Sequence, residues 1–219
     1  MTLISFTEKA AVARAGSLFL KLLWLDELAT EGLNKIATSE DAGDIETLID
    51  LTDEMLTLLD DLEPAASLLV HIVEKSRGFL NAVFPDVVSR NAEYFTSRFD
   101  ALRLEPGLLV ERFEKMGGFE NAALNSANTL LFESAGLREN LQRRKRDLAN
   151  REVTQADFPH RIGCALFIGG AVLALVGGIA AGVPLLAAGG AATILAVEAP
   201  TASVFLTTIA SAACSGCFD

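Results

Sequence analysis

Charge is missing from one long stretch of this chain. Residues 162–197 are thirty-six amino acids without a single Asp, Glu, Lys, Arg or His. After Glu198 and Pro200 the sequence is apolar again as far as Phe218. This composition excludes a water-exposed surface, so the stretch must lie in a bilayer or in a protein core.

Cysteine and positive charge are also scarce. Three cysteines, Cys164, Cys214 and Cys217, are too few to form a disulfide framework, and all three lie in or beside the apolar region. The formal net charge of −11 argues against nucleic acid as a partner. The first residues lack the basic and apolar regions of a secretory signal peptide, so cleavage is not expected.

Motifs that mark catalytic sites are absent as well. The sequence has no phosphate-binding glycine loop, no His-Glu-x-x-His and no Gly-x-Ser-x-Gly, and His71 and His160 are far apart in sequence. We therefore expect a protein that is not an enzyme and uses no cofactor or metal. The single Cys-x-x-Cys lacks the second ligand pair of a zinc site, so Cys214 and Cys217 are interpreted as apolar filler or as juxtamembrane acylation sites, with a redox or metal role as a further alternative.

The apolar region is long enough to cross a membrane more than once. Residues 162–181 supply one helical span of about 20 residues, the length that a bilayer core requires. Gly182, Val183 and Pro184 then favour a turn, and a second span begins at Leu185. We expect a helical hairpin. The second arm either continues through a kink at Pro200 or is followed by a third, weaker span.

Small residues recur in this region at helical spacing. Gly170, Ala174, Gly178 and Gly182 stand four residues apart, which places them on one face of a helix. Such a glycine-zipper pattern lets helices approach closely in lipid, and it predicts a tight hairpin or a homo-oligomer seam. Chance matches in a Gly/Ala-rich segment are the alternative. Glu198 is interpreted as a carboxylate at the membrane interface or, alternatively, as a buried or pore-lining group.

The preceding residues are acidic and helical in pattern. Ser5 and Glu8 have the spacing of a capping box. The apolar run at residues 18–25 predicts a core helix, or alternatively an interfacial helix with Trp24 at the headgroups. Residues 26–63 hold thirteen carboxylates and one base, with apolar residues at helical spacing, so we expect an amphipathic helix.

Further helices are expected as far as residue 152, with no strand. Proline and glycine are expected to separate them: Pro64 and Pro85 each open a helix, and Pro106, Gly117 and Gly118 each break one. His71, which stands among apolar residues, is interpreted as a hydrogen-bonded core histidine. The fold class is therefore all-α, with an acidic bundle at 1–155, a basic linker at 156–161 and the hydrophobic hairpin at 162–218.

Basic residues gather just before the first span. They are Arg143, Arg144, Lys145, Arg146 and Arg161. Basic residues at this position mark the cytoplasmic side and attract anionic lipid. The alternative is that they pair with the acidic residues of 26–63 in the folded bundle.

Two functions follow from this organisation. The first is a membrane protein whose residues 1–155 face the cytoplasm and bind a protein partner, with the hairpin as anchor. The second is a protein that is soluble first, then inserts its hairpin and oligomerises into a pore. The organisation is similar in outline to helical pore-forming toxins. In hydropathy it resembles bacterial effectors that sit in host vacuole membranes.

Overall fold

The described part of the chain is built from helices. The computed structural model describes residues 5–39, 42–90, 106–152 and 159–180, together with Cys217. Within these ranges no strand occurs, which confirms the all-α class. The helices are α1 (Phe6–Ser39), α2 (Ala42–Leu58), the 3-10 turn η1 (Leu59–Asp61), α3 (Leu62–Lys75), α4 (Phe79–Arg90), α6 (Pro106–Lys115), α7 (Phe119–Ala149) and α8 (His160–Ala180).

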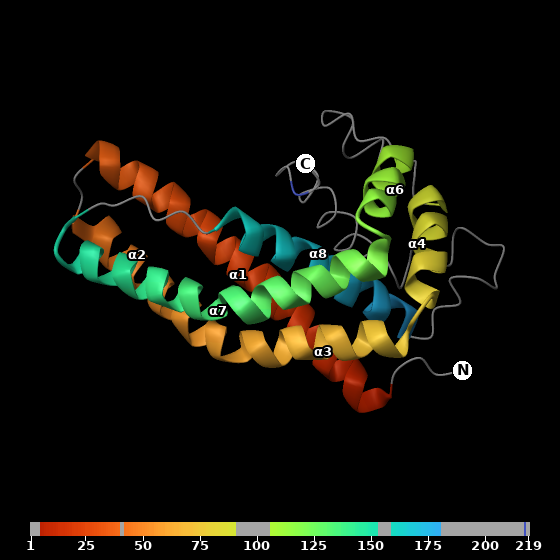
Figure 1. Cartoon of the computed structure of the whole chain (residues 1–219). Coiled ribbons are helices and arrows are strands. Elements are labelled where there is room, and N and C mark those ends of the chain that lie inside the picture. Colours follow the sequence, from red (N-terminus) through yellow and green to blue (C-terminus); the bar gives the residue numbers. More distant parts are fainter. Residues whose placement is uncertain (1–4, 40–41, 91–105, 153–158, 181–216, 218–219) are drawn as a thin grey trace.

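Long helices lie side by side along most of the bundle (Figure 1). With 34 residues, α1 is about 50 Å long. It contacts α2, α3 and α8. On the other side α7 contacts the same three helices, so α8 lies between α1 and α7. The shorter helices α4 and α6 pack together at one end of the bundle.

The breaks between helices agree only partly with the sequence analysis. Gly117 and Gly118 take φ values of +85° and +99° between α6 and α7, which confirms the predicted break. The turn that ends with Gly78, at φ +79°, was not predicted. The prediction that a helix begins at Pro85 is wrong, because Pro85 lies inside α4. Buried side chains on both sides of it, such as Phe84 and Val87, hold α4 against the core despite the hydrogen bond that proline cannot make.

Three phenylalanines join α4, α6 and α7 at the end of the bundle. The rings of Phe84 and Phe119 stack with centroids 4.3 Å apart, and Phe113 meets Phe84 edge-on at 4.8 Å. Beside them, the buried carboxylate of Glu120 accepts hydrogen bonds from the backbone N–H groups of Gly78 and Leu80, at 2.9 and 3.0 Å. These N–H groups lie at the start of α4, where no helical partner is available, so Glu120 caps that helix.

The first predicted span forms α8, and this helix is part of the bundle core. Buried residues from Ile162 to Val176 belong to the same hydrophobic cluster as buried residues of α1, α3 and α7. The described part of the predicted hairpin, residues 162–180, therefore shares one core with the helices of the predicted bundle. Whether 1–155 folds alone stays a prediction. The predicted turn at 182–184, the second arm and Glu198 lie outside the described residues.

Candidate functional site

The main candidate site is α8, an apolar helix buried in an otherwise amphipathic bundle. Among the described residues it is the one helix long and apolar enough to cross a membrane, a property that core helices of soluble proteins share. Its buried side chains contact α1, α3 and α7. Each of those helices turns charged residues to the opposite, solvent-facing side. The arrangement therefore hides a membrane-length apolar helix from water.

Glycine governs how closely α8 approaches its neighbours. A Cβ atom on Gly169 would lie 2.8 Å from the Phe19 ring of α1 and 3.1 Å from Leu69 of α3. One on Gly177 would lie 3.7 Å from Val12 of α1. These contacts are van der Waals distances or shorter, so α8 and α1 pack closely because position 169 has no side chain.

The packing face predicted from Gly170, Ala174, Gly178 and Gly182 lies only partly within the described residues. Gly170 is buried and Ala174 is half-buried in the bundle, while Gly178 lies in α8 without a described environment and Gly182 lies outside the described residues. The glycine in closest contact, Gly169, is one position before the predicted series. Association of this face with another hairpin arm or another copy stays a prediction.

The basic residues near the end of α7 divide into an inner and an outer group. Arg144 is 3% exposed and lies 3.8 Å from Asp26 of α1, and Lys145 binds Asp53 of α2 at 2.6 Å. These two ion pairs agree with the alternative prediction, in which basic residues pair with acidic residues of 26–63 in the folded bundle. Arg143 pairs at 3.5 Å with Glu139 of its own helix. Arg146 and Arg161 are exposed and form the outer group.

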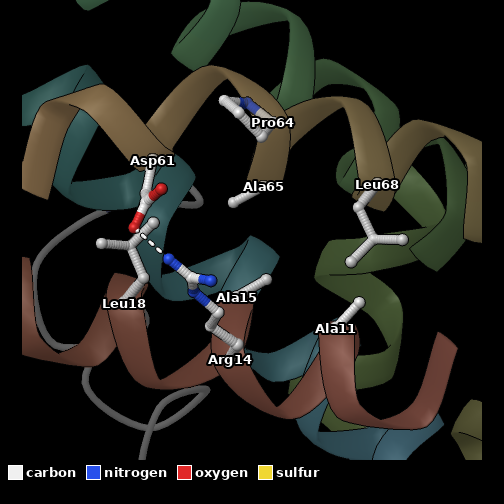
Figure 2. A pocket seen from close by; sticks show the side chains of 8 residues that line it. All are labelled: Ala11, Arg14, Ala15, Leu18, Asp61, Pro64, Ala65 and Leu68. Carbon is white, nitrogen blue, oxygen red and sulfur yellow. Dashed lines mark hydrogen bonds and ion pairs between the residues drawn. The ribbon is translucent and has the colours of Figure 1, made fainter. Parts of the chain in front are cut away.

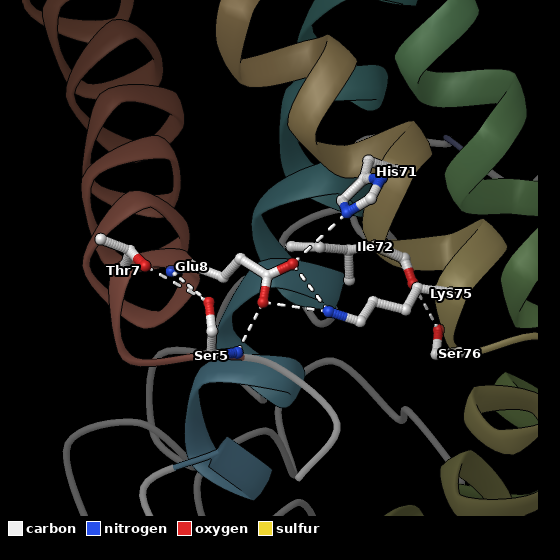
Figure 3. Close-up of polar contacts among 7 residues, drawn as sticks. All are labelled: Ser5, Thr7, Glu8, His71, Ile72, Lys75 and Ser76. Carbon is white, nitrogen blue, oxygen red and sulfur yellow. Dashed lines mark hydrogen bonds and ion pairs between the residues drawn. The ribbon is translucent and has the colours of Figure 1, made fainter.

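Glu8 joins the start of α1 to α3 (Figure 3). As the capping box predicts, the Ser5 backbone N–H donates to Glu8 at 2.5 Å, and the Glu8 N–H donates to the Ser5 hydroxyl at 3.3 Å. The Lys75 ammonium binds Glu8 at 2.8 Å, and His71 approaches it at 3.3 Å. These contacts, led by Lys75 and then Ser5, lower the pKa of Glu8 from 4.5 to about 2.

The interpretation of His71 as a core residue is wrong. Its side chain is 59% exposed and lies on the surface of α3, next to Glu8. The apolar neighbours of His71 in sequence, such as Leu69 and Ile72, point into the core instead. Helical periodicity separates adjacent residues onto different faces, and it was the signal in the sequence for the exposed position of His71.

A cleft of about 320 Å³ opens between α1 and α3 (Figure 2). Small side chains, Ala11, Ala15 and Ala65, line it, and Arg14 reaches across to Asp61 at 2.7 Å. The alanines leave room because they fill less volume than the leucines found elsewhere in the core. The ion pair closes one side of this space.

Two of the three cysteines form a disulfide that the sequence analysis did not predict. Cys217 forms a disulfide with Cys164, 53 residues earlier, and so ties the end of the chain to the first turns of α8. In this oxidised state Cys217 carries no thiol for acylation. Cys214 lies outside the described residues.

His160 completes a small cluster with these two sulfurs. Its ring nitrogens lie 3.7 and 3.9 Å from Sγ of Cys164, and the ligand atoms of His160, Cys164 and Cys217 are within 4.8 Å of one another. The Cys-x-x-Cys at 214–217 does not predict this cluster. The His-x-x-x-Cys spacing at 160–164, which puts both side chains on one helix face, was the available signal.

Comparisons of the chain with protein-family models, with curated protein sequences and with solved structures gave no match.

Proposed function

We propose that this protein is a conditional membrane inserter, which stays water-soluble while α8 is covered and releases α8 into a bilayer. The observation that supports the proposal is the burial of a membrane-length apolar helix between α1 and α7. Helices that are apolar on every side are found in large cores or in membranes. Here the covering helices are amphipathic, so the cover itself is compatible with water.

Exchange of α8 between bundle and bilayer has a small energetic penalty for α8 itself. Its Val, Leu and Ile side chains lose bundle contacts but gain lipid contacts, so they stay out of water in both states. The cost falls on α1, α3 and α7, whose inner faces lose their partner. We propose that these faces then rest on the membrane surface, as amphipathic helices do.

Exposed side chains support a first encounter with the membrane. Trp24 of α1 is 57% exposed and Phe132 of α7 is 84% exposed, although both are large and apolar. Aromatic rings of this kind partition into the membrane interface. The outer basic residues Arg146 and Arg161 are available for anionic headgroups at about 1 kcal/mol each. Oligomerisation through Gly170, Ala174 and Gly178 would follow insertion, because small residues allow close helix packing in lipid.

A constitutive anchor is the second candidate. Arg161 stands at the start of α8, and the helix has the length and composition of a span. In that case residues 1–155 would face the cytoplasm and recruit a protein partner through their acidic surface. The two candidates differ in whether α8 is packed against α1 before a membrane is met.

A reversible covalent lock on α8 tests this difference. A Cβ atom on Gly16 of α1 would lie 3.7 Å from Cβ of Leu173 in α8, which is the usual Cβ separation of a disulfide. Gly16→Cys with Leu173→Cys, in a chain whose native cysteines are replaced by serine, should therefore cross-link when the detergent-free protein is oxidised. The single variants serve as matched controls.

Conditional insertion predicts three results. The native chain fractionates as soluble without detergent, the oxidised double variant fails to insert into or permeabilise vesicles, and reduction restores both. A constitutive anchor instead sediments with membranes as made and does not form the cross-link. Equal vesicle activity of the locked and reduced forms would show that α8 is not the inserting segment.

A further inference from the structure

Three metal-binding side chains converge at the start of α8. His160 and Cys164 are one helical turn apart on one face, and Cys217 is brought to them from the end of the chain. The imidazole lies in solvent, whereas the two sulfurs are partly covered. The membrane insertion proposed above assigns no chemical role to this cluster.

Chemistry of the cluster depends on its oxidation state. While the two sulfurs are bonded to each other, neither is a thiolate, and only His160 can bind a metal. Two equivalents of a small thiol reduce the disulfide by exchange: the S–S bond breaks, each cysteine sulfur gains a proton, and the two reductant sulfurs form a new disulfide. The product places two thiols beside an imidazole, a donor set that suits Zn²⁺.

The distance between His160 and Cys164 fits tetrahedral zinc. With bonds of about 2.1 Å to nitrogen and about 2.3 Å to sulfur, a tetrahedral site separates N and S by about 3.6 Å. The shorter His160–Cys164 distance is 3.7 Å, so these two groups need almost no movement. A tetrahedral site holds two sulfurs about 3.8 Å apart, so zinc binding requires the sulfurs of Cys164 and Cys217 to separate after reduction.

We propose that the reduced chain binds one Zn²⁺ through His160, Cys164 and Cys217, at the position that the disulfide occupies in the oxidised chain. Binding displaces the two thiol protons to solvent, so affinity rises with pH. Three protein ligands leave a fourth position for water. Disulfide and zinc thus exclude each other, yet each ties the chain end to α8.

Metal titration of the full chain tests this site. The Cys214→Ser background limits binding to the three described ligands. Zn²⁺ affinity is measured by competition with a chromophoric chelator before and after reduction. Co²⁺ replaces Zn²⁺ to report thiolate ligands by charge-transfer absorption. The test variants are His160→Gln, Cys164→Ser and Cys217→Ser, and His71→Gln is the matched control because His71 is also an exposed helical histidine.

We expect one equivalent to bind only after reduction, with thiolate absorption. Each test variant should weaken affinity more than about 10-fold, the least that loss of even an outer-shell partner costs, and His71→Gln should leave it unchanged. Circular dichroism checks folding, which the exposed His160→Gln should not alter. Equal affinity of the oxidised and reduced chains, or full affinity in His160→Gln or in either cysteine variant, would overturn the proposal.

Discussion

Gly169 of α8 and Phe19 of α1 approach so closely that a Cβ atom at position 169 would lie 2.8 Å from Cε2 of the Phe19 ring. Phe19 is fully buried, and the same Cβ atom would lie 3.1 Å from Cδ2 of the buried Leu69 in α3. Neither side chain can move without disturbing the core. This contact therefore reports directly on whether α8 is seated in the bundle.

A single methyl group at this position should destabilise the protein. Gly169→Ala is expected to lower the free energy of unfolding by about 1–3 kcal/mol through overpacking, less the gain of up to about 1 kcal/mol in helix propensity. Gly163→Ala in the same helix is the control, since its Cβ meets nothing within 4 Å. Denaturant unfolding without detergent measures both. Equal effects of the two substitutions would place α8 outside the bundle.

Glu120 should contribute more to stability than other glutamates of α7. Glu120→Gln keeps one acceptor oxygen and replaces the other by an NH₂ group, so the N–H of either Gly78 or Leu80 loses its acceptor. We expect a loss of about 1–3 kcal/mol from this unsatisfied buried donor and from the lost charge at the start of α4. Glu139→Gln, which removes an exposed pair with Arg143, should change stability by less than about 0.5 kcal/mol. A similar small change for both variants would contradict the capping role.

Glu8 should make stability depend on pH in acid. Its folded pKa of about 2 lies below the ordinary 4.5, so its contribution is complete above 4.5 and is lost as the pH falls toward 2. Glu8→Gln is expected to be less stable than the native chain at neutral pH, and the two should converge near pH 2. Thermal unfolding across this range is the measurement, with exposed Glu63→Gln of α3 as control. A constant difference between native and Glu8→Gln would refute the assignment.

Arg144 should be a stability residue rather than a lipid-binding one. The Arg144 side chain is buried 3.8 Å from the partly exposed Asp26, so Arg144→Met removes a cation beside that carboxylate. Because Asp26 keeps some contact with solvent, we expect a loss of about 1–3 kcal/mol. The exposed neighbour Arg146, changed to Met, should cost less than about 0.5 kcal/mol. Thermal unfolding measures the stability of both variants. Equal losses of stability in Arg144→Met and Arg146→Met would contradict a structural role for Arg144.

Arg146 and Arg161 should instead govern membrane affinity. Replacing both with Gln is expected to weaken binding to anionic vesicles by about 1 kcal/mol per residue, and added salt should mimic the loss by screening. Lys115→Gln on α6 removes another exposed cation and is the control. Binding is compared on neutral and anionic vesicles over a salt series. Unchanged affinity in the double variant would assign these arginines no lipid role.

Local rules were sufficient to predict much of the helical framework. The capping box of Ser5 and Glu8, the break at Gly117 and Gly118 and the start of a helix near residue 160 all depend on neighbours within four residues. Hydrogen bonding and φ preferences act over that range, so the sequence by itself determines them. The apolar character of α8 is likewise a property of composition.

Partners distant in sequence were decided only by the tertiary structure. Apolar composition suits lipid and protein core equally, so it does not predict that Gly169 packs against Phe19. That contact depends on how the helices pack in the folded bundle. Periodicity places His71 on a helix face but does not say that Glu8 lies there, and charge does not pair Arg144 with Asp26, 118 positions away in the sequence. The joining of Cys164 to Cys217 depends on where the fold brings the chain end, because disulfide geometry requires their Cα atoms, here 5.3 Å apart, to meet in space.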